Sequence, residues 1–243
     1  MSFLEVRHVQ KIYTTRFGGT KVQALTDVNF TVEKGESGSG KTTLLNILAA
    51  LDKPTGGEVV LDGRPLSTIP EREIAAFRRS QLGFVFQEFN LLDTFSVQDN
   101  IFLPLVLAGK AYPEMAARLA PIARQLGIAE LLQKFPYELS GGQKQRVTIT
   151  HPKLVLADEP TGALDSRATD ELLRLFEDVN RGGQTILMVT HSVKAASHAS
   201  RVLFIKDGEV FHEIYRGESS DEQLYQKISD TLTMLATGGE HHA

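Results

Sequence analysis

The sequence contains no cysteine in its 243 residues, which excludes disulfide bonds, thiol catalysis and cysteine-ligated zinc and fits a reducing compartment. It also lacks an apolar run of the roughly 20 residues that a transmembrane helix needs, because the stretch 101–108 is short and contains Pro104. The first ten residues include Glu5, Arg7 and His8 and do not resemble a secretory signal. We therefore expect a cytoplasmic protein that does not cross a membrane by itself.

An excess of positive charge is also absent. The 26 Lys and Arg residues are outnumbered by 30 Asp and Glu, so we expect no general attraction to nucleic acid or to anionic lipid. Any anion site must therefore be local. The composition, with 42% hydrophobic residues and with its glycines and prolines spread along the chain, is that of a folded globular protein. Its length suits one large domain or two small ones.

The hydrophobic pattern predicts strands at both ends of the chain. Polar and apolar residues alternate over 27–33, as in a strand with one wet face, and 58–63 ends in an Asp-Gly turn. The apolar runs 154–157 and 186–189 are unbroken, as in parallel strands that are covered on both faces. Residues 202–211 predict a hairpin with a second Asp-Gly turn. Together these segments indicate an α/β core.

The middle of the chain, from about residue 96 to 132, has a helical pattern, with Pro113 near a helix start and Gly127 as a stop. We interpret residues 1–243 as a single domain with four parts: a β-rich part about 1–90, a helical subdomain about 91–150, a core about 151–215 and a tail about 216–243.

The strongest local motif is GESGSGKT at 35–42, which matches the phosphate-loop pattern G-x-x-x-x-G-K-[ST] and runs into an apolar helix. Its glycines let backbone N–H groups approach phosphate oxygens, and the helix N-terminus adds partial positive charge. We expect Lys41 to reach the β and γ phosphates and the Thr42 hydroxyl to bind Mg²⁺. The alternative is a flexible Gly/Ser loop without a ligand.

Other candidate residues follow apolar strands or open a helix. Asp158 and Glu159 end an apolar strand, as a metal ligand and a base would, although such pairs also cap helices. Gln87 and His191 also follow strands, where each could instead be structural. The segment LSGGQ at 139–143 either caps a helix or offers N–H groups to an anion. Tyr13 either stacks on an adenine or is an ordinary strand residue.

In this order, the phosphate loop, Gln87, LSGGQ, LVLADE at 154–159, GALD at 162–165 and His191 resemble the ATP-binding subunit of an ABC transporter. LSGGQ is the specific element, because phosphate-loop kinases and GTPases lack it. The resemblance covers nearly the whole chain and implies a P-loop ATPase core with a mostly parallel sheet, an antiparallel β subdomain and an inserted helical subdomain. It also implies ATP and Mg²⁺ as cofactors.

The resemblance assigns roles to individual residues. The nucleotide would be held by Tyr13, Gly35, Glu36, Ser37, Gly38, Ser39, Gly40, Lys41, Thr42 and Thr43. Thr42, Gln87 and Asp158 would be the metal ligands. Glu159 would be the catalytic base and His191 the switch that contacts the γ-phosphate, with Lys41 and Gln87 completing the catalytic set. The ATP of an opposite subunit would meet Ser140, Gly141, Gly142 and Gln143, with Asp165 at the subunit interface.

These roles imply a head-to-tail homodimer that docks on a separate permease near Glu88 to Leu92, at the inner face of the membrane. Within the family, FQEFNLLDTFSVQDNI, ADEPTGALDS and RVLFIKDGEVF are similar to peptide-antibiotic exporters of the bacitracin-resistance type, and next to the macrolide and lipoprotein-release types. Two alternatives are a non-transport ABC ATPase and a non-hydrolysing adaptor that binds a permease or a sensor kinase. The single cassette argues against the first.

Two places depart from the family pattern. The half-exposed strand VNFTVEK stands directly before Gly35, where the family predicts an apolar central strand of about seven residues, and RVTIT reaches His151 with part of the signature helix missing. Residues absent from the printed sequence, a genuine double deletion and a divergent replacement are the possible explanations, of which we favour the first. A genuine deletion predicts loss of nucleotide binding, because a central strand contributes more than the ~5–15 kcal/mol by which a domain is stable.

Overall fold

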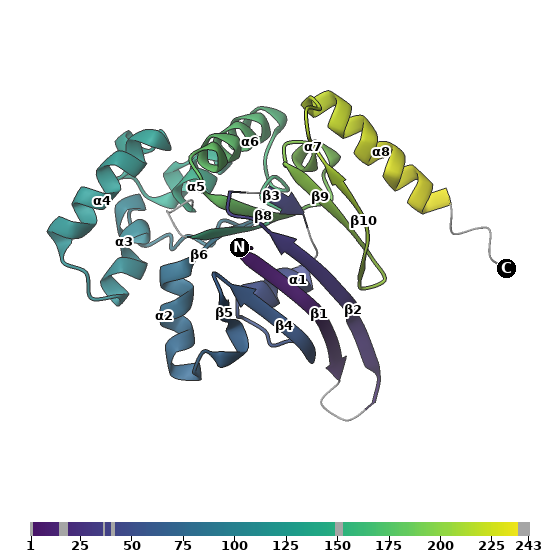
Figure 1. Cartoon of the computed structure of the whole chain (residues 1–243). Helices are drawn as coiled ribbons and strands as arrows, with labels where there is room; N and C mark the ends of the chain where they lie inside the picture. Colours follow the sequence, from purple (N-terminus) through teal and green to yellow (C-terminus); the bar gives the residue numbers. More distant parts are fainter. Residues whose placement is uncertain (1, 15–18, 36, 40–41, 149–152, 238–243) are drawn as a thin grey trace.

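The computed structural model describes residues 2–14, 19–35, 37–39, 42–148 and 153–237, which fold into two sheets surrounded by helices (Figure 1). The strands are β1 Leu4–Thr14, β2 Lys21–Val32, β3 Ser37–Ser39, β4 Gly56–Leu61, β5 Arg64–Pro65, β6 Leu82–Phe86, β7 Leu154–Asp158, β8 Thr185–Val189, β9 Arg201–Lys206 and β10 Glu209–Tyr215. The α-helices are α1 Thr42–Leu48, α2 Glu71–Gln81, α3 Val97–Leu107, α4 Tyr112–Gln125, α5 Gly141–Thr148, α6 Ser166–Arg181, α7 Val193–Ala196 and α8 Asp221–Thr237.

The first sheet has the strand order β5-β4-β1-β2-β10-β9, and its neighbours are antiparallel except at the β10–β2 pair. Both predicted Asp-Gly turns are present: Asp62 and Gly63 have φ of 50° and 75°, and Asp207 and Gly208 have φ of 52° and 81°. Positive φ at both central residues matches the right-handed twist of the flanking strands, which explains the preference for Asp-Gly. This sheet is the predicted antiparallel β subdomain.

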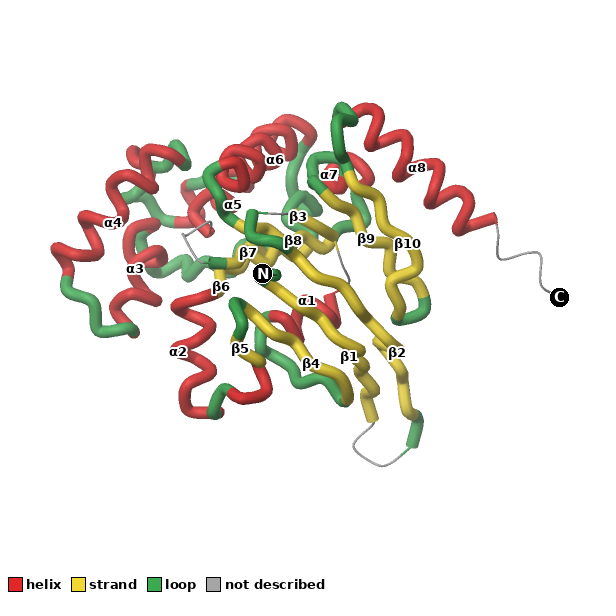
Figure 2. Tube along the Cα trace, in the orientation of Figure 1, coloured by secondary structure: helices red, strands yellow, loops and turns green. Residues whose placement is uncertain are grey.

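The second sheet, β3-β8-β7-β6, is parallel throughout. All five residues of β8 and the first four of β7 are buried, as their unbroken apolar sequences predict. Figure 2 shows the strands of both sheets in yellow, with the red helices α2, α4, α6 and α8 toward the outside. Because parallel strands end at one edge, the residues that follow β6, β7 and β8 gather at the same side of the core.

The helical subdomain predicted for 91–150 contains α3, α4 and α5 and lies at the left of Figure 1. Ser96 caps α3 by accepting a hydrogen bond from the backbone N–H of Asp99, and Pro113 lies in the first turn of α4. Gly127 follows the end of α4 with φ of 64°, so it supplies the left-handed residue that ends many helices. The α/β class with these subdomains is confirmed.

The element before α1 is the main departure from a complete core. β3 has three residues and uses Ser37–Ser39, which belong to the predicted phosphate loop, whereas its neighbours β8 and β7 have five residues each. α5 is likewise short, with eight residues before the chain reaches β7. Both short elements stand at the two places where the sequence predicts missing residues.

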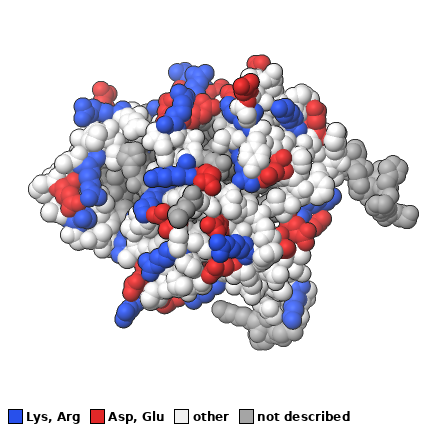
Figure 3. All heavy atoms as spheres, viewed as in Figure 1, with Lys and Arg blue, Asp and Glu red and all other residues white. Residues whose placement is uncertain are grey.

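The tail forms helix α8, which begins against the body and extends away from it at the upper right of Figure 1. Leu224 and Ile228 on its buried side pack with Ala196 of α7 and with Val202 and Phe204 of β9. No helix in the described ranges is long and apolar enough to span a membrane. On the face drawn in Figure 3, basic and acidic side chains are interspersed.

Candidate functional site

Two of the three candidate metal ligands, Thr42 and Asp158, meet between the start of α1 and the end of β7. The Thr42 hydroxyl donates a hydrogen bond to Oδ1 of Asp158 over 3.2 Å. A hydroxyl oxygen and a carboxylate oxygen are the hard donors that Mg²⁺ prefers, and they come from the two elements that the sequence predicts. This donor pair therefore fits the metal.

Glu159 follows Asp158 in a constrained conformation. Its φ is 44°, in the left-handed region that costs a non-glycine residue of the order of 1 kcal/mol or more. Oε1 accepts a hydrogen bond from the backbone N–H of His191 over 2.8 Å, and Oε2 accepts one from the Thr190 hydroxyl over 3.1 Å. Two donors from the end of β8 thus fix the direction of the carboxylate.

His191 lies beside this carboxylate but is open to solvent. Its Nε2 is 3.8 Å from Oε1 of Glu159, and its side chain is 95% exposed. A cavity of about 440 Å³ borders this histidine together with Thr42 and Thr43, and the α8 residues Ile228 and Leu232 line its other side. The predicted switch residue and the predicted metal ligand therefore open into one cavity.

The predicted phosphate loop is described only in part, because Glu36, Gly40 and Lys41 lie outside the described residues. Ser37, Gly38 and Ser39 pair with Ile186, Leu187 and Met188 of β8 as strand β3. Gly35 is held just before this strand, with its N–H donating to Thr185 Oγ1 over 2.8 Å and its carbonyl accepting from Asn180 Nδ2 over 2.7 Å. Only two residues separate the end of β3 from the start of α1.

Tyr13, the candidate adenine platform, belongs to a small polar cluster. Its hydroxyl donates to Asp52 Oδ2 over 3.0 Å, and Lys11 Nζ lies 2.5 Å from Asp52 Oδ1 and 4.9 Å from the centre of the Tyr13 ring. Partial burial and the neighbouring Asp52 carboxylate raise the pKa of Tyr13, and Thr43 is a further hydrogen-bond partner. Tyr13 therefore lies next to the first turn of α1.

Asp52 is acidic in this cluster. Partial burial alone would raise the pKa of Asp52, but hydrogen bonds from Lys11 and Tyr13 outweigh it and hold the pKa below its ordinary value of 3.8. The sequence pattern does not reveal Asp52, because it stands in a loop after α1 and contacts Lys11 only through the fold.

Gln87 follows β6 and packs against the loop after Glu159. A Cβ atom built on Gly162 would lie 3.0 Å from Cδ of Gln87, so a larger residue at this position would push the Gln87 side chain aside. A second glutamine, Gln145 of α5, is fully buried and bridges the same two segments. Sequence reasoning misses Gln145, because one glutamine in a polar helix carries no pattern of its own.

The signature segment lies on a different surface. Ser140 Oγ accepts from the N–H of Gln143, whose Oε1 accepts in return from the N–H of Ser140, so the pair caps α5. Asp165 caps α6 by accepting from the N–H of Ala168. Ser140, Gly141, Gly142, Gln143 and Asp165 share a cavity of about 330 Å³ that is separate from the cavity lined by Thr42 and His191.

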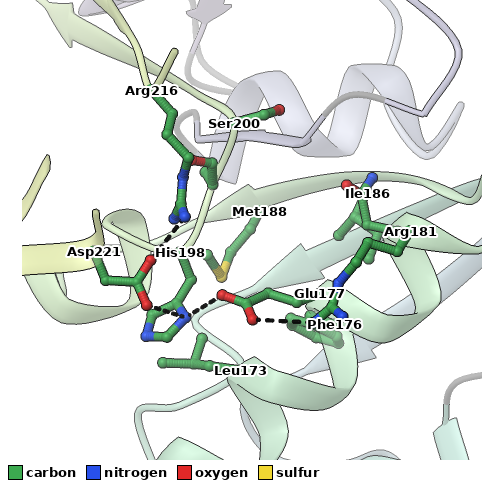
Figure 4. Close-up of a pocket in the computed structure, with 12 residues that line it drawn as sticks. Leu173, Phe176, Glu177, Arg181, Ile186, Met188, His198, Ser200, Arg216 and Asp221 are labelled. Atoms are coloured by element: carbon green, nitrogen blue, oxygen red, sulfur yellow. Dashed lines mark hydrogen bonds and ion pairs between the residues drawn. The ribbon is translucent and has the colours of Figure 1, made fainter. Parts of the chain in front are cut away.

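A charged cluster away from the site holds α8 in place (Figure 4). Glu177, His198 and Asp221 have potential ligand atoms within 4.8 Å of one another. Their carboxylates are also paired with arginines: Asp221 Oδ1 lies 2.7 Å from Arg216 Nη1, and Glu177 Oε2 lies 3.6 Å from Arg181 Nη2. We interpret this cluster as the polar anchor between α6 and α8.

The comparison with protein families identifies the chain. Residues 25–162 match the model described as ABC transporter. The chain belongs to the ABC transporter family. The ATP-binding proteins of this family are ATPases, and this ABC subunit is one of them.

Similar proteins agree with this assignment. The ABC transporter ATP-binding protein YxdL of Bacillus subtilis is 47% identical over 96% of this chain and 95% of its own. The bacitracin export ATP-binding protein BceA of Halalkalibacterium halodurans is 42% identical over 97% of each chain. The cassette MJ0796, solved as a dimer in a post-hydrolysis state bound to ADP and Pi, has a TM-score of 0.75 and 34% identity over 87% of this chain and 98% of its own.

The alignments also bear on the two short elements. The BceA alignment runs over 250 positions and covers 97% of a chain of 243 residues, so about 14 of its positions contain no residue of this ABC subunit. This number supports the shortage of residues that the sequence pattern predicts.

Proposed function

We propose that this ABC subunit is the ATP-driven motor of an exporter for peptide antibiotics. The observation that carries the proposal is the meeting of Thr42 with Asp158 and of Glu159 with His191 at one edge of the parallel sheet. A metal-ligand pair beside an oriented carboxylate is the arrangement that phosphoryl transfer to water needs.

In this proposal each group has one task. Thr42 and Asp158, with Gln87, would hold Mg²⁺, which would supply positive charge against the phosphates, and Lys41 would bind the β and γ phosphates. Glu159 orients the attacking water and accepts its proton as general base. The hydrogen bonds from Thr190 and His191 keep that carboxylate in position before the substrate arrives.

We also propose that two copies associate head to tail, so that Ser140 to Gln143 of one copy complete the ATP site of the other. The separation of the two cavities within one chain supports this arrangement, because the signature residues do not reach Thr42 in their own subunit. The solved dimer of the similar cassette MJ0796 supports it as well.

The proposed permease contact is the surface loop 88–92 after Gln87. Phe89 and Asn90 both have positive φ, at 61° and 51°, and Leu92 and Phe95 are 45% and 38% exposed. The loop and Phe95 just beyond it thus present apolar side chains close in sequence to Gln87, a candidate metal ligand. Docking there would place the subunit at the cytoplasmic face of the membrane, and the similarity to BceA favours a peptide antibiotic as cargo.

The test is the substitution Glu159→Gln in the intact chain. Removing a general base is expected to slow ATP turnover about 100-fold or more, while ATP still drives dimerisation, as measured by phosphate release and by light scattering. Glu130→Gln, at an exposed position of the 3-10 helix Ala129–Leu131, is the matched control and should turn over ATP at the wild-type rate. Undiminished turnover by Glu159→Gln would remove Glu159 as the base.

A second candidate function is a non-hydrolysing adaptor for a permease or a sensor kinase. The observation in its favour is β3, which engages Ser37–Ser39 in the sheet and leaves only two residues before α1. Co-purification of a permease with a wild-type chain that releases no phosphate from ATP would favour the adaptor. Phosphate release that the permease stimulates would favour the motor.

A further inference from the structure

We propose that Gln145 is a positioning residue that holds the two catalytic strand ends together. Its Nε2 donates to the carbonyl of Phe86 over 2.9 Å and to the carbonyl of Pro160 over 2.8 Å. Phe86 is the last residue of β6 and immediately precedes Gln87, whereas Pro160 immediately follows Glu159. One amide group therefore joins the residues adjacent to the candidate metal-site glutamine and the candidate base.

The orientation of this amide is fixed by its partners. An NH₂ group has two hydrogens, and both are used here, one for each carbonyl. The opposite orientation would place an oxygen against two carbonyl oxygens, which repel it. Gln145 is fully buried, so water does not compete for these carbonyls.

A role in packing alone does not account for this residue. Its Oε1 is buried and has no hydrogen-bond partner in the part of the chain that the structure describes. A buried polar atom without a partner is unfavourable, and an apolar side chain of the same length would fill the space without that cost. The two hydrogen bonds that the amide donates offset the cost of its buried, unpartnered oxygen.

The bridge acts on the geometry of the site. Within the sheet, Phe86 pairs with Asp158, and beyond it the turn after Glu159 closes with a hydrogen bond from the N–H of Gly162 to the Glu159 carbonyl. Gln87 packs on that same Gly162. Without the amide, the β6 end and this turn can separate beyond the last sheet pair, which moves Gln87 relative to Glu159.

The bridge also comes from the signature helix. Gln145 lies two residues after the segment Ser140 to Gln143, and Arg146 next to it is paired with Glu171 of α6 over 2.8 Å. In the proposed dimer this helix faces the ATP of the opposite subunit. Gln145 therefore connects the signature surface of a subunit to that subunit's own base, a step that rests on the proposed function.

The experiment is the substitution Gln145→Met, which keeps the length of the side chain and removes both donors. We expect kcat for ATP to fall at least tenfold with KM within twofold of the wild type, since the two hydrogen bonds of the Gln145 amide go to backbone carbonyls and not to a candidate nucleotide-binding side chain. Gln133→Met, on an exposed segment, is the control that should change neither quantity. Unchanged kcat in Gln145→Met would overturn the proposal. A lower kcat accompanied by a lower melting temperature and a raised KM would also overturn it, because that pattern indicates general loss of structure.

A second measurement tests the bridge without ATP turnover. Hydrogen exchange of the nucleotide-free Gln145→Met chain should accelerate at 87–90 and 161–163 and stay at the wild-type rate in β1 and β2. Exchange rates at both segments that equal those of the wild type would overturn the bridge. This result does not depend on ATP hydrolysis: a wild type that does not hydrolyse ATP would refute only the motor function. If Gln145→Met does not fold, Gln145→Asn, one methylene shorter, should show the same two local accelerations.

Discussion

Asp52 ties together the side chains around the candidate adenine platform. Lys11, whose side chain is 10% exposed, has its ammonium group 2.5 Å from Asp52, and the Tyr13 hydroxyl donates to the other carboxylate oxygen. The cation is therefore largely removed from water and depends on this carboxylate for compensation. Removing one partner of such a pair leaves a buried charge, which is more costly than losing a surface ion pair.

We expect Asp52→Asn to lower the free energy of unfolding by about 1–2 kcal/mol at pH 7, less than the ~3–5 kcal/mol of a fully buried pair because Asp52 is partly exposed. The melting temperature should fall by several degrees. Because the pKa of Asp52 is lowered on folding, its contribution is present above 3.8 and is lost as the pH falls further. Thermal melts of wild type and variant should therefore converge below that pH.

The control for this prediction is Asp93→Asn, which changes an exposed carboxylate in a loop. Its melting temperature should stay within about a degree of the wild type, in line with the small effects of most surface substitutions. A deficit of Asp52→Asn that persists unchanged at pH 3 would show that lost packing, and not the ion pair, causes it.

At the scale of elements, β3 is the part of the core with the least support. Its sequence, Ser-Gly-Ser, offers no apolar side chain, whereas the adjacent β8 is buried at all five positions. Glycine and serine are poor strand residues, so the pairing of β3 with β8 depends on backbone hydrogen bonds and on the anchoring of Gly35 by Thr185 and Asn180. A longer strand with apolar side chains would pair with more of β8 and would bury more apolar area against it.

Inserting seven apolar, strand-forming residues between Glu36 and Ser37 should release Ser37–Ser39 from the sheet into a loop. We expect the affinity for ATP, measured by calorimetry, to rise at least tenfold, and the melting temperature to rise by several degrees as apolar area becomes buried. An insertion of seven Gly and Ser residues is the control, with no gain in stability expected. Equal affinity for ATP before and after the apolar insertion would contradict this account.

The sequence predicts the elements whose signals are local. The Asp-Gly turns, the helix start near Pro113, the Gly127 stop and the buried strands β7 and β8 all occur where their residues place them. The meeting of Thr42 with Asp158 is also predictable, because both stand at known ends of their elements. The bridging role of Gln145 is not predictable, because its two carbonyl partners are 59 and 15 residues away. Every residue has a backbone carbonyl, so the residue types do not show which carbonyls accept these hydrogen bonds.

At the scale of the whole molecule, the two candidate surfaces of this ABC subunit are complementary. One carries Thr42 and His191, and the other carries Ser140, Gly141 and Asp165 in a separate cavity. If each ATP site takes one surface from each copy, a defect in Glu159 and a defect in the signature of the opposite copy fall in the same site. The second site of that dimer then keeps both of its surfaces intact.

Mixing two inactive variants, Glu159→Gln and Gly141→Asp, should therefore restore ATP turnover. A side chain at Gly141 approaches Leu164 to 3.0 Å and adds negative charge where the opposite ATP would bind, so each homodimer should be inactive. Equal amounts of the two variants form mixed dimers as about half of the population, and each mixed dimer has one intact site. Phosphate release should therefore recover to about a quarter of the wild-type rate if the sites are independent.

The control is a mixture of Glu159→Gln with the variant that carries both Glu159→Gln and Gly141→Asp, because its mixed dimers have no intact site. Turnover that stays at the level of the separate variants would mean that each subunit completes its own site, and the head-to-tail arrangement would be wrong.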